Sequence, residues 1–356
     1  MKRCIVVLLV AAVSLFAGYS GESHAKDITI KMTGHMPVGH SVTLASQMFQ
    51  KEVEKRSNGT MKFQYFPAGQ LAMDMKAFEL CKSGGVDMIE MFVNRTAGVI
   101  PESTLMDIPT FGDTGNFARQ YYDTSSGGAI FINLLRPLFA KQGLYLMPGF
   151  LYSPEHCVIT NRPVEKLSDY KGMKLRSPSI CMGYAIQAWG AVPTVMGSSD
   201  VYLALQRGTI EGANSGVTTF VSRKWFEVAS HVQYIHELAA SVDVVVNMKF
   251  WEGLTPEQQN IIKESLRGAV IWSYEKAQSD VEGNIKFLRS KGVTLTDWLK
   301  EKPDELEKMR KVTLEKMDVE IPRLTGDSAW KAWKDSYAKS LKGSRGWKEV
   351  ISTVKY

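Results

Sequence analysis

Arg176 is the residue whose type and position most directly suggest chemistry. It stands in the segment Tyr170-Lys-Gly-Met-Lys-Leu-Arg-Ser-Pro178. We expect a short strand over 173–175 that ends at Arg176, because Pro178 cannot continue the hydrogen-bond ladder, and a helix over 182–189. A guanidinium there can point into a cleft and hold a carboxylate or a sulfonate with two parallel hydrogen bonds. A structural salt bridge is the alternative role for this arginine.

Further candidates for a binding site lie near the expected ends of strands, where α/β sheets bind ligands. Glu90 and Phe92 share one face of a strand because their spacing is two, although Phe92 is equally suited to the core. Asp74 has a second interpretation, since an acidic residue in the first turn of a helix is favoured by the helix dipole. The full set of candidate ligand-binding residues is His35, Asp74, Glu90, Phe92, Arg95, His156, Arg176 and Asn214.

The common catalytic motifs are absent from the sequence. It contains no G-x-S-x-G, H-E-x-x-H, G-x-x-x-x-G-K-[ST], G-x-G-x-x-G or C-x-x-C. His231 and His236 are five residues apart, which suits a shared metal on a helix poorly. We therefore expect no catalytic residue, no metal and no cofactor. An exported hydrolase or isomerase acting on a small organic acid, with His35, Glu155 or His156 as acid–base groups, stays open as the alternative.

The elements that must position these residues alternate between strand and helix. The pattern predicts strands over 28–33, 61–66 and 86–92 with helices over 41–57 and 73–83 between them. This order is typical of an open α/β sheet with helices on both faces. A second set of alternating elements follows over 174–214, and the β-branched run 242–248 predicts a buried strand.

A long helix is predicted near the end of the chain. Thr255-Pro-Glu-Gln258 combines an N-cap, a proline at the first helical position and a capping-box glutamine. Apolar residues then recur at helical spacing as far as Leu288, and Gly292 ends the pattern. At 1.5 Å per residue the helix would be on the order of 50 Å long, which exceeds the width of one domain. It could therefore brace two domains.

The N-terminus and the composition indicate an exported protein. A basic start, an apolar run over 4–17 and Ser23-His-Ala25 are typical of a signal peptide covering residues 1–25. The formal charge of +6 is spread evenly, which favours an anion-binding protein and gives little support to nucleic-acid binding. Three cysteines follow the signal peptide, so pairing cannot be complete. A Cys157–Cys181 bridge is possible, but buried free thiols are favoured.

Several segments together resemble one protein family. These are Gly34-His-Met-Pro-Val-Gly-His-Ser41, Phe66-Pro-Ala-Gly-Gln-Leu71, Gly85-Val-Asp-Met88, Val201-Tyr-Leu-Ala-Leu-Gln-Arg-Gly208 and Ile210-Glu-Gly212, with the Arg176 segment. Their order and spacing are similar to those of the substrate-binding proteins of tripartite ATP-independent periplasmic (TRAP) transporters. The resemblance implies that Arg176 grips the acid group of the ligand. It also implies a monomeric periplasmic receptor, not an enzyme, that delivers a small organic anion to membrane permease subunits.

The resemblance also implies a two-domain periplasmic binding protein with a hinge and a long helix along its back. We expect domain I to comprise residues 26–153 and 242–281, and domain II residues 154–241 and 282–356. The cleft between them would close around the ligand, so that Arg176 and Asn214 meet His35 and Glu90 across it.

Two departures from the family pattern bear on the ligand. Many relatives carry a second arginine about twenty residues before the first, where this chain has Glu155-His156. The usual Glu-Asn after the V-D-G element reads Asn214-Ser215. We therefore expect a monoanion, either a small hydroxy- or keto-carboxylate or a hydroxyalkyl sulfonate. An aromatic acid, held by Phe92 or Trp189, is the alternative ligand.

Overall fold

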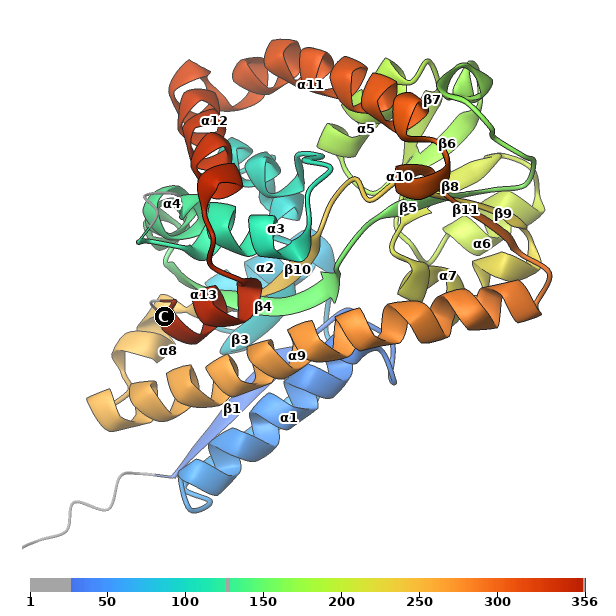
Figure 1. The fold of residues 1–356 in the computed structure, drawn as a ribbon. Helices are drawn as coiled ribbons and strands as arrows, with labels where there is room; N and C mark the ends of the chain where they lie inside the picture. Colours follow the sequence, from blue (N-terminus) through green and yellow to red (C-terminus); the bar gives the residue numbers. More distant parts are fainter. Residues whose placement is uncertain (1–26, 126–128, 355) are drawn as a thin grey trace, which may run out of the picture.

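The first of two β-sheets forms the core of one half of the molecule. The computed structural model describes residues 27–125, 129–354 and 356, and the sheet has the strand order β2-β1-β3-β10-β4 (Figure 1). β1 runs parallel to β2 and β3, whereas β10 is antiparallel to β3 and β4. Every residue of β10 is buried, as its β-branched sequence predicts. The strands are β1 (Ile28–Thr33), β2 (Met61–Phe66), β3 (Met88–Met91), β4 (Leu144–Ser153) and β10 (Ala240–Asn247).

The second sheet forms the core of the other half and has the order β11-β9-β5-β8-β6-β7. β6 lies between β7 and β8 and runs parallel to both. The sequence did not predict β9 and β11, which pair with each other in parallel at one edge. The strands are β5 (Cys157–Thr160), β6 (Lys174–Ser177), β7 (Val192–Val195), β8 (Gly212–Ser215), β9 (His231–Tyr234) and β11 (Thr294–Asp297).

Two short segments and one long helix join the halves, and the C-terminal helices cross between them once more. Residues 154–156 join β4 to β5, and residues 235–239 join β9 to β10. The two segments touch where the amide of Glu237 donates to the carbonyl of His156 at 3.4 Å. Helix α9 (Pro256–Ser290) packs against α1 and β4 of the first half and against α7 and β11 of the second (Figure 1). The predicted α/β fold with two halves and a bracing helix is confirmed.

The remaining helices cover the sheets and link them. α1 packs on the first sheet beside α9, and α5 follows β6 in the second half. The α-helices are α1 (Ser41–Arg56), α2 (Asp74–Lys82), α3 (Thr114–Tyr122), α4 (Arg136–Lys141), α5 (Ile180–Ala188), α6 (Val201–Gln206), α7 (Val217–Ser222), α8 (Met248–Glu252), α10 (Trp298–Glu301), α11 (Pro303–Thr325), α12 (Asp327–Lys342) and α13 (Trp347–Thr353). Short 3₁₀ turns span Val93–Thr96, Pro101–Asp107, Leu167–Tyr170 and Trp225–Glu227, and a π-turn spans Phe131–Leu135.

The C-terminal helices return from the second half to the first. α11 packs on α5, whereas α12 and α13 contact α3. Trp333 is buried in this contact and donates its indole N–H to the carbonyl of Leu105 at 3.0 Å. The predicted boundaries grouped residues 282–356 in domain II without anticipating this return, and the division into domains stays a prediction.

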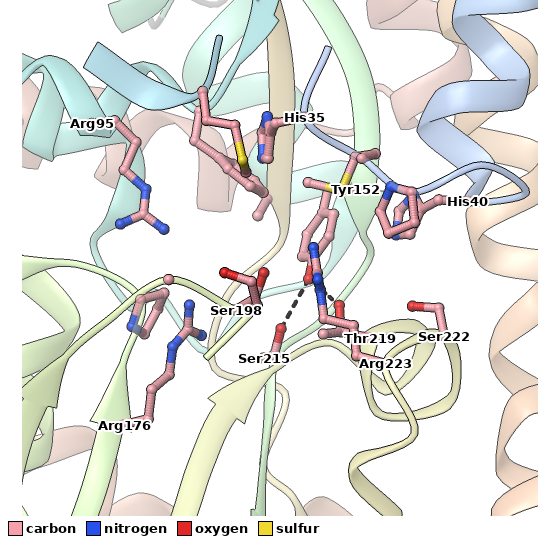
Figure 2. A pocket seen from close by; sticks show the side chains of 18 of the residues that line it. His35, His40, Arg95, Tyr152, Arg176, Ser198, Ser215, Thr219, Ser222 and Arg223 are labelled. Atoms are coloured by element: carbon pink, nitrogen blue, oxygen red, sulfur yellow. Dashed lines mark hydrogen bonds between the residues drawn. The ribbon is translucent and has the colours of Figure 1, made fainter. Parts of the chain in front are cut away.

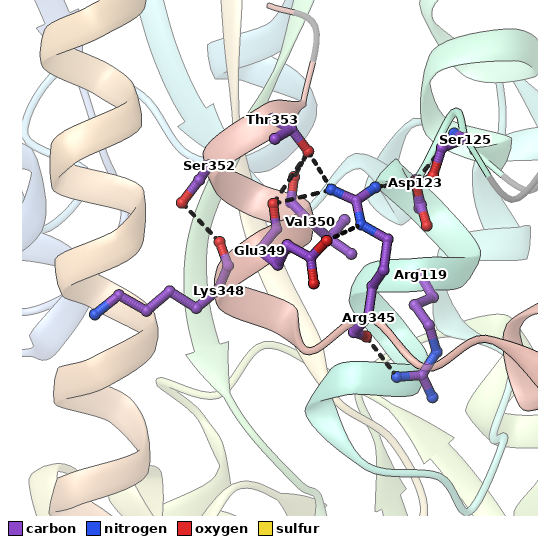
Figure 3. A network of polar contacts seen from close by, with 9 residues as sticks. All are labelled: Arg119, Asp123, Ser125, Arg345, Lys348, Glu349, Val350, Ser352 and Thr353. Carbon is purple, nitrogen blue, oxygen red and sulfur yellow. Dashed lines mark hydrogen bonds and ion pairs between the residues drawn. The ribbon is translucent and has the colours of Figure 1, made fainter.

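Arg345 fixes the last helix to α3 (Figure 3). Its Nη1 donates to Asp123 at 2.6 Å and to Ser125 at 2.9 Å. Its Nε donates to Glu349 at 2.8 Å, and its Nη2 donates to Thr353 at 2.6 Å. All three guanidinium nitrogens are therefore occupied by groups of the protein itself.

Two further expectations concern the ends of the chain and its cysteines. The predicted signal peptide, residues 1–25, lies outside the described residues. Among the described helices, none combines the length and apolarity needed to cross a bilayer. Cys81, Cys157 and Cys181 are all buried and free, so the Cys157–Cys181 bridge is not formed.

Candidate functional site

A cavity of about 280 Å³ lies between the two halves, close to the segments that join them. Each half contributes part of its wall. Figure 2 shows His35, His40, Arg95 and Tyr152 facing Arg176, Ser215, Thr219 and Arg223 across this space. The principal lining residues are His35, Met36, Pro37, His40, Phe92, Asn94, Arg95, Asp107, Tyr152, His156, Arg176, Ser198, Ser215, Thr219, Ser222 and Arg223.

Arg176 is held in place by main-chain carbonyl groups. Its Nε donates to Met196 at 3.1 Å, and its Nη1 donates to Asn214 at 2.7 Å. The guanidinium carbon lies 5.9 Å from the centre of the Trp225 ring. The side chain is only 2% exposed. Of its five N–H groups two are used in this way, which leaves one on Nη1 and both on Nη2 to meet a ligand end-on.

The local sequence explains why Arg176 stands at the cavity. β6 is an interior strand, and Arg176 is paired with Thr194 of β7 and Ala213 of β8. Ser179 then caps α5 by accepting from the amide of Met182 at 3.1 Å. The predicted strand-to-helix junction is therefore present, and Arg176 lies at the carboxyl end of its strand.

The charges of the cavity are dominated by arginine. Burial, together with the positive charges of Arg95 and Arg223, lowers the pKa of Arg176 to about 9. Burial raises the pKa of Asp107 to about 6, although a hydrogen bond from Ser179 and the charges of Arg95 and Arg176 oppose this shift. Three guanidinium groups thus share a small space with one deeply buried carboxyl group, an arrangement that favours anion binding.

Aromatic rings form one wall of the cavity. Tyr152 meets Phe92 edge-on, with ring centres 5.0 Å apart, and stacks on His40 at 5.4 Å. His35 lies against the other side of Phe92 at 5.2 Å. The hydroxyl of Tyr152, on the strand that leaves the first half, hydrogen-bonds Ser215 at 2.9 Å. This contact ties the aromatic wall to the second half.

His156 contributes an uncharged imidazole to the cavity. Burial, followed by the charge of Arg176, lowers its pKa to about 3. The residue is 4% exposed, and neither ring nitrogen hydrogen-bonds a described residue. A neutral imidazole has one donor and one acceptor; Asn214 lies near enough to oppose the shift slightly, and the ring can still offer a polar atom to the ligand. His156 is thus a neutral residue beside the guanidinium of Arg176.

Glu155 turns away from the cavity to the opposite side of the hinge. Its carboxylate pairs with His236, whose other ring nitrogen lies 3.1 Å from Asp297. Burial lowers the pKa of His236, but the two carboxylates outweigh it, and the net shift is upward. Our expectation that Glu155 would confront a second acid group of the ligand loses its basis, since the side chain faces elsewhere.

The structure brings five of the eight predicted site residues to the cavity wall: His35, Phe92, Arg95, His156 and Arg176. Asn214 lies behind the wall, where its side chain donates to Glu237 and its carbonyl accepts from Arg176. Glu90 lies beneath the first loop, packed against Gly34, and accepts from Ser46 and Tyr65.

Two other predicted residues are not found in the wall. Asp74 begins α2, but its side chain lies outside the part of the structure that is described. Trp189, proposed as a plate for an aromatic acid, is buried and donates to Thr313 at 2.9 Å, away from the cavity.

Sequence reasoning missed several lining residues. Asp107 is the last residue of a 3₁₀ turn, and nothing in its neighbours marks it. Tyr152 sits inside an apolar strand. Arg223 could have been found, because it ends the first short helix after β8 and so belongs to the loops at the carboxyl edge of the second sheet. Within the described residues, no group of three or more His, Cys, Asp or Glu side chains could hold a metal ion.

Comparisons with known proteins point to one family. The model of the bacterial extracellular solute-binding proteins of family 7, the DctP family, matches residues 33–320. The chain is 24% identical over 270 residues to the sialic acid-binding periplasmic protein of Vibrio cholerae, a match that covers 75% of this chain and 82% of that protein. It is also 24% identical over 296 residues to the C4-dicarboxylate-binding periplasmic protein of Rhodobacter capsulatus, covering 83% and 87%.

A solved structure shares the fold. It is a TRAP periplasmic solute-binding protein from Desulfovibrio desulfuricans with bound sn-glycerol-3-phosphate, which superposes with a TM-score of 0.80 at 20% identity and covers 89% of this chain and 99% of that chain. The alternative of a hydrolase or isomerase finds no support, since the matching family consists of receptors. The family model spans most of the chain, so the chain belongs to family 7 of the bacterial extracellular solute-binding proteins, the solute receptors of TRAP transporters.

Proposed function

We propose that this protein captures a small organic acid between its two halves and delivers it to the membrane permease of a TRAP transporter. The observation that carries the proposal is Arg176, a buried guanidinium with three N–H groups directed to the cavity rather than to the protein. An arginine held in this way can bind a carboxylate or a sulfonate end-on with two hydrogen bonds. The acid group therefore binds at Arg176.

The rest of the cavity limits the ligand. A volume of about 280 Å³ suits a small molecule rather than an oligomer. His156 and Ser215 offer neutral hydrogen-bonding groups, which suit a hydroxyl or keto group next to the acid. Relatives named for sialic acid and for C4-dicarboxylates support an acidic ligand in general. An aromatic acid stays the alternative, because Phe92 lines the wall.

Ligand capture is coupled to closure of the two halves. The cavity takes its walls from both halves, and residues 154–156 and 235–239 join the halves beside it. A ligand that contacts both walls stabilises the closed arrangement in proportion to its additional contacts there. The closed form is then the state that the permease recognises. We further propose that residues 1–25 direct export and that the receptor works as a monomer.

The test identifies the bound ligand and then measures whether the protein becomes more compact when it binds. Protein purified from its own host is analysed by native mass spectrometry, and the released acid is weighed before and after prolonged incubation with fresh protein. Small-angle scattering is then recorded with and without that acid. We expect an unchanged mass and a smaller radius of gyration on binding. An altered mass would indicate an enzyme, and an unchanged radius at saturation would exclude a closing cleft.

A further inference from the structure

We propose that Glu237, in the hinge segment 235–239, is a positioning residue of the binding site. Through Asn214 it fixes the orientation of Arg176 and His156 toward the ligand. The inference rests on the proposed function, because it concerns how the residues of that same site are held in place. Glu237 does not line the cavity, so its effect on the ligand is indirect.

Glu237 contacts both halves of the molecule and the other hinge segment. Its amide donates to the carbonyl of His156 at 3.4 Å. Its carbonyl accepts from the amide of Phe111, in the loop that precedes α3 of the first half, at 2.9 Å. Its carboxyl group accepts from the side-chain amide of Asn214 on β8 of the second half. Glu237 therefore links the conformation of the hinge to the strand that carries Asn214.

Asn214 connects the carboxyl group of Glu237 to the cavity wall. The pairing between β6 and β8 ends at Ala213, and the carbonyl of Asn214 accepts from Nη1 of Arg176 at 2.7 Å. The side chain of Asn214 also lies near enough to His156 to raise its pKa, against the larger effect of burial. Because the amide nitrogen donates to a carboxyl group, the amide oxygen is the atom left for the imidazole. One anchored amide thus restricts two residues of the site.

Stability alone does not explain a carboxyl group at this position. The side chain of Glu237 is fully buried, and its Oε2 has no hydrogen-bond partner in the part of the chain that the structure describes. Burial raises its pKa to about 8, opposed by the hydrogen bond from Asn214 and reinforced by the charge of Asp107. An apolar side chain of similar size would avoid the cost of burying this group. The position is explained by what the carboxyl group holds, which is Asn214.

The position of Asn214 matters to the ligand because it sets the plane of a guanidinium group. Two parallel hydrogen bonds to an acid group require one orientation of Arg176. The carbonyls of Met196 and Asn214 fix that orientation from behind. A displacement of Asn214 as the halves separate would turn the guanidinium out of it. Ligand affinity therefore depends on the conformation of the hinge through Glu237.

The experiment removes the acceptor while keeping the size of the side chain. Glu237→Leu removes both carboxyl oxygens, whereas Glu237→Gln is the conservative variant, since its amide oxygen can still accept from Asn214. Asn214→Ala and the double variant with Glu237→Leu complete a mutant cycle. The matched control is Asp243→Val on β10, which removes a buried carboxyl group whose partners Tyr122 and Gly149 do not line the cavity.

The probes are lactate, glycerate, 3-hydroxybutyrate, butyrate, succinate and 2-hydroxyethanesulfonate. Each is titrated into the wild type by calorimetry, and the acid that binds most tightly is then used for every variant. Arg176→Ala is included to test the site itself. The melting temperature without ligand is recorded for each protein, so that a loss of affinity can be separated from a loss of stability.

We expect Glu237→Leu to weaken binding by about 10-fold, since misplacing Arg176 costs about one hydrogen bond to a charged group. Its melting temperature without ligand should be no lower than that of the wild type. Glu237→Gln should bind like the wild type, and the double variant should bind no more weakly than the weaker of its two single variants. Asp243→Val should lose stability but not affinity.

Normal affinity of Glu237→Leu, together with lost binding in Arg176→Ala, would overturn this inference and leave the proposed function intact. Asn214→Ala breaks the same contact from the other side, so its normal affinity would have the same meaning even if Glu237→Leu did not fold. Additive losses in the double variant, or an equal loss of affinity in Asp243→Val, would also overturn the inference. Undiminished binding to Arg176→Ala would overturn the proposed function itself, and a wild type that binds none of the acids would overturn both.

Discussion

Two arginine–aspartate groups in this molecule serve opposite purposes. At the C-terminal end, Arg345 uses all three of its nitrogens on Asp123, Ser125, Glu349 and Thr353. In the cavity, Arg176 uses two of its five N–H groups on main-chain carbonyls and leaves the others for a ligand. The first arginine is satisfied by the protein, and the second is completed only by another molecule.

The carboxyl pKa values of the two aspartates, Asp123 and Asp107, are shifted in opposite directions. Burial raises the pKa of Asp123, but hydrogen bonds from Ser125 and the charge of Arg345 outweigh it, and the net shift is downward. For Asp107, burial prevails over Ser179, Arg95 and Arg176, and the pKa rises to about 6. Asp123 thus adds stability above its unfolded pKa, which is lost as the pH falls through its folded value.

Asp107 has the opposite linkage. Its stabilising contribution is greatest below the ordinary aspartate pKa and is lost as the pH rises to about 6. A carboxyl group whose ionisation costs stability marks a place where the fold tolerates an unfavourable charge. Strongly shifted pKa values cluster at functional sites, which agrees with the position of Asp107 in the cavity wall.

The largest expected effect is a loss of ligand affinity when Arg176 is replaced. Arg176→Ala should weaken binding of an acid that stabilises the wild type by roughly 2–5 kcal/mol, because the acid group loses its charged partner in a desolvated site. Arg176→Lys should not restore affinity, since a lysine has no planar fork. The melting temperature without ligand should stay close to that of the wild type. If calorimetry found near-normal affinity for the alanine variant, Arg176 would not be a ligand-binding residue.

The second effect is on stability alone. Arg345→Ala should lower the free energy of unfolding by about 2 kcal/mol, less than for a fully buried pair because the Arg345 side chain is 23% exposed. Ligand affinity should be unchanged, since neither Arg345 nor its partners line the cavity. Chemical denaturation measures the loss. The control is Lys348→Ala in α13, three residues further on, whose exposed pair with Glu275 should contribute well under 1 kcal/mol. Equal losses in both variants would contradict a special role for Arg345.

Much of this contrast could not be predicted from the sequence. The strand-to-helix junction at Arg176 follows from Pro178 and the capping Ser179, and β1, β2 and α9 follow from their apolar periodicity. β9 and β11 were missed because each is four residues long and carries polar side chains such as Gln233 and Thr296. Short strands of this kind depend on pairing between distant segments, which local patterns do not record.

The directions of the side chains at the hinge could not be predicted from the sequence either. Glu155 and His156 lie in a bend between β4 and β5, and their side chains point to different sides: His156 lines the cavity and Glu155 pairs with His236. Which of the two side chains faces the ligand depends on the ion pair that Glu155 forms on the other side. Its partner there, His236, comes from a distant segment of the chain. The prediction for Glu90 met the same difficulty, since Gly34 and Tyr65 fix its surroundings.

The smallest expected effect concerns the pH dependence of binding. An anion bound beside ionised Asp107 meets a like charge, whereas protonation of that carboxyl removes the repulsion. Because the pKa of Asp107 is about 6, affinity should rise a few-fold as the pH falls from 7.5 to 5 and should level off below that value. His40 and His156 do not contribute, since burial first and neighbouring positive charges second hold both pKa values at about 3.

The measurement needs an acid that stays ionised throughout, such as a sulfonate or a carboxylate with a pKa below 4, titrated by calorimetry at several pH values. Asp107→Asn is the matched variant, because its amide oxygen can still accept the hydrogen bond from Ser179. It should bind at pH 7.5 at least as tightly as the wild type binds at pH 5, with little dependence on pH. The same pH dependence in both proteins would assign the titration to another group. The first candidate would then be the buried Glu237 behind Asn214, because burial raises its pKa to about 8. A flat wild-type profile would mean that Arg95 and Arg176 already balance Asp107, and that this carboxylate resembles Asp123 more closely than its raised pKa implies.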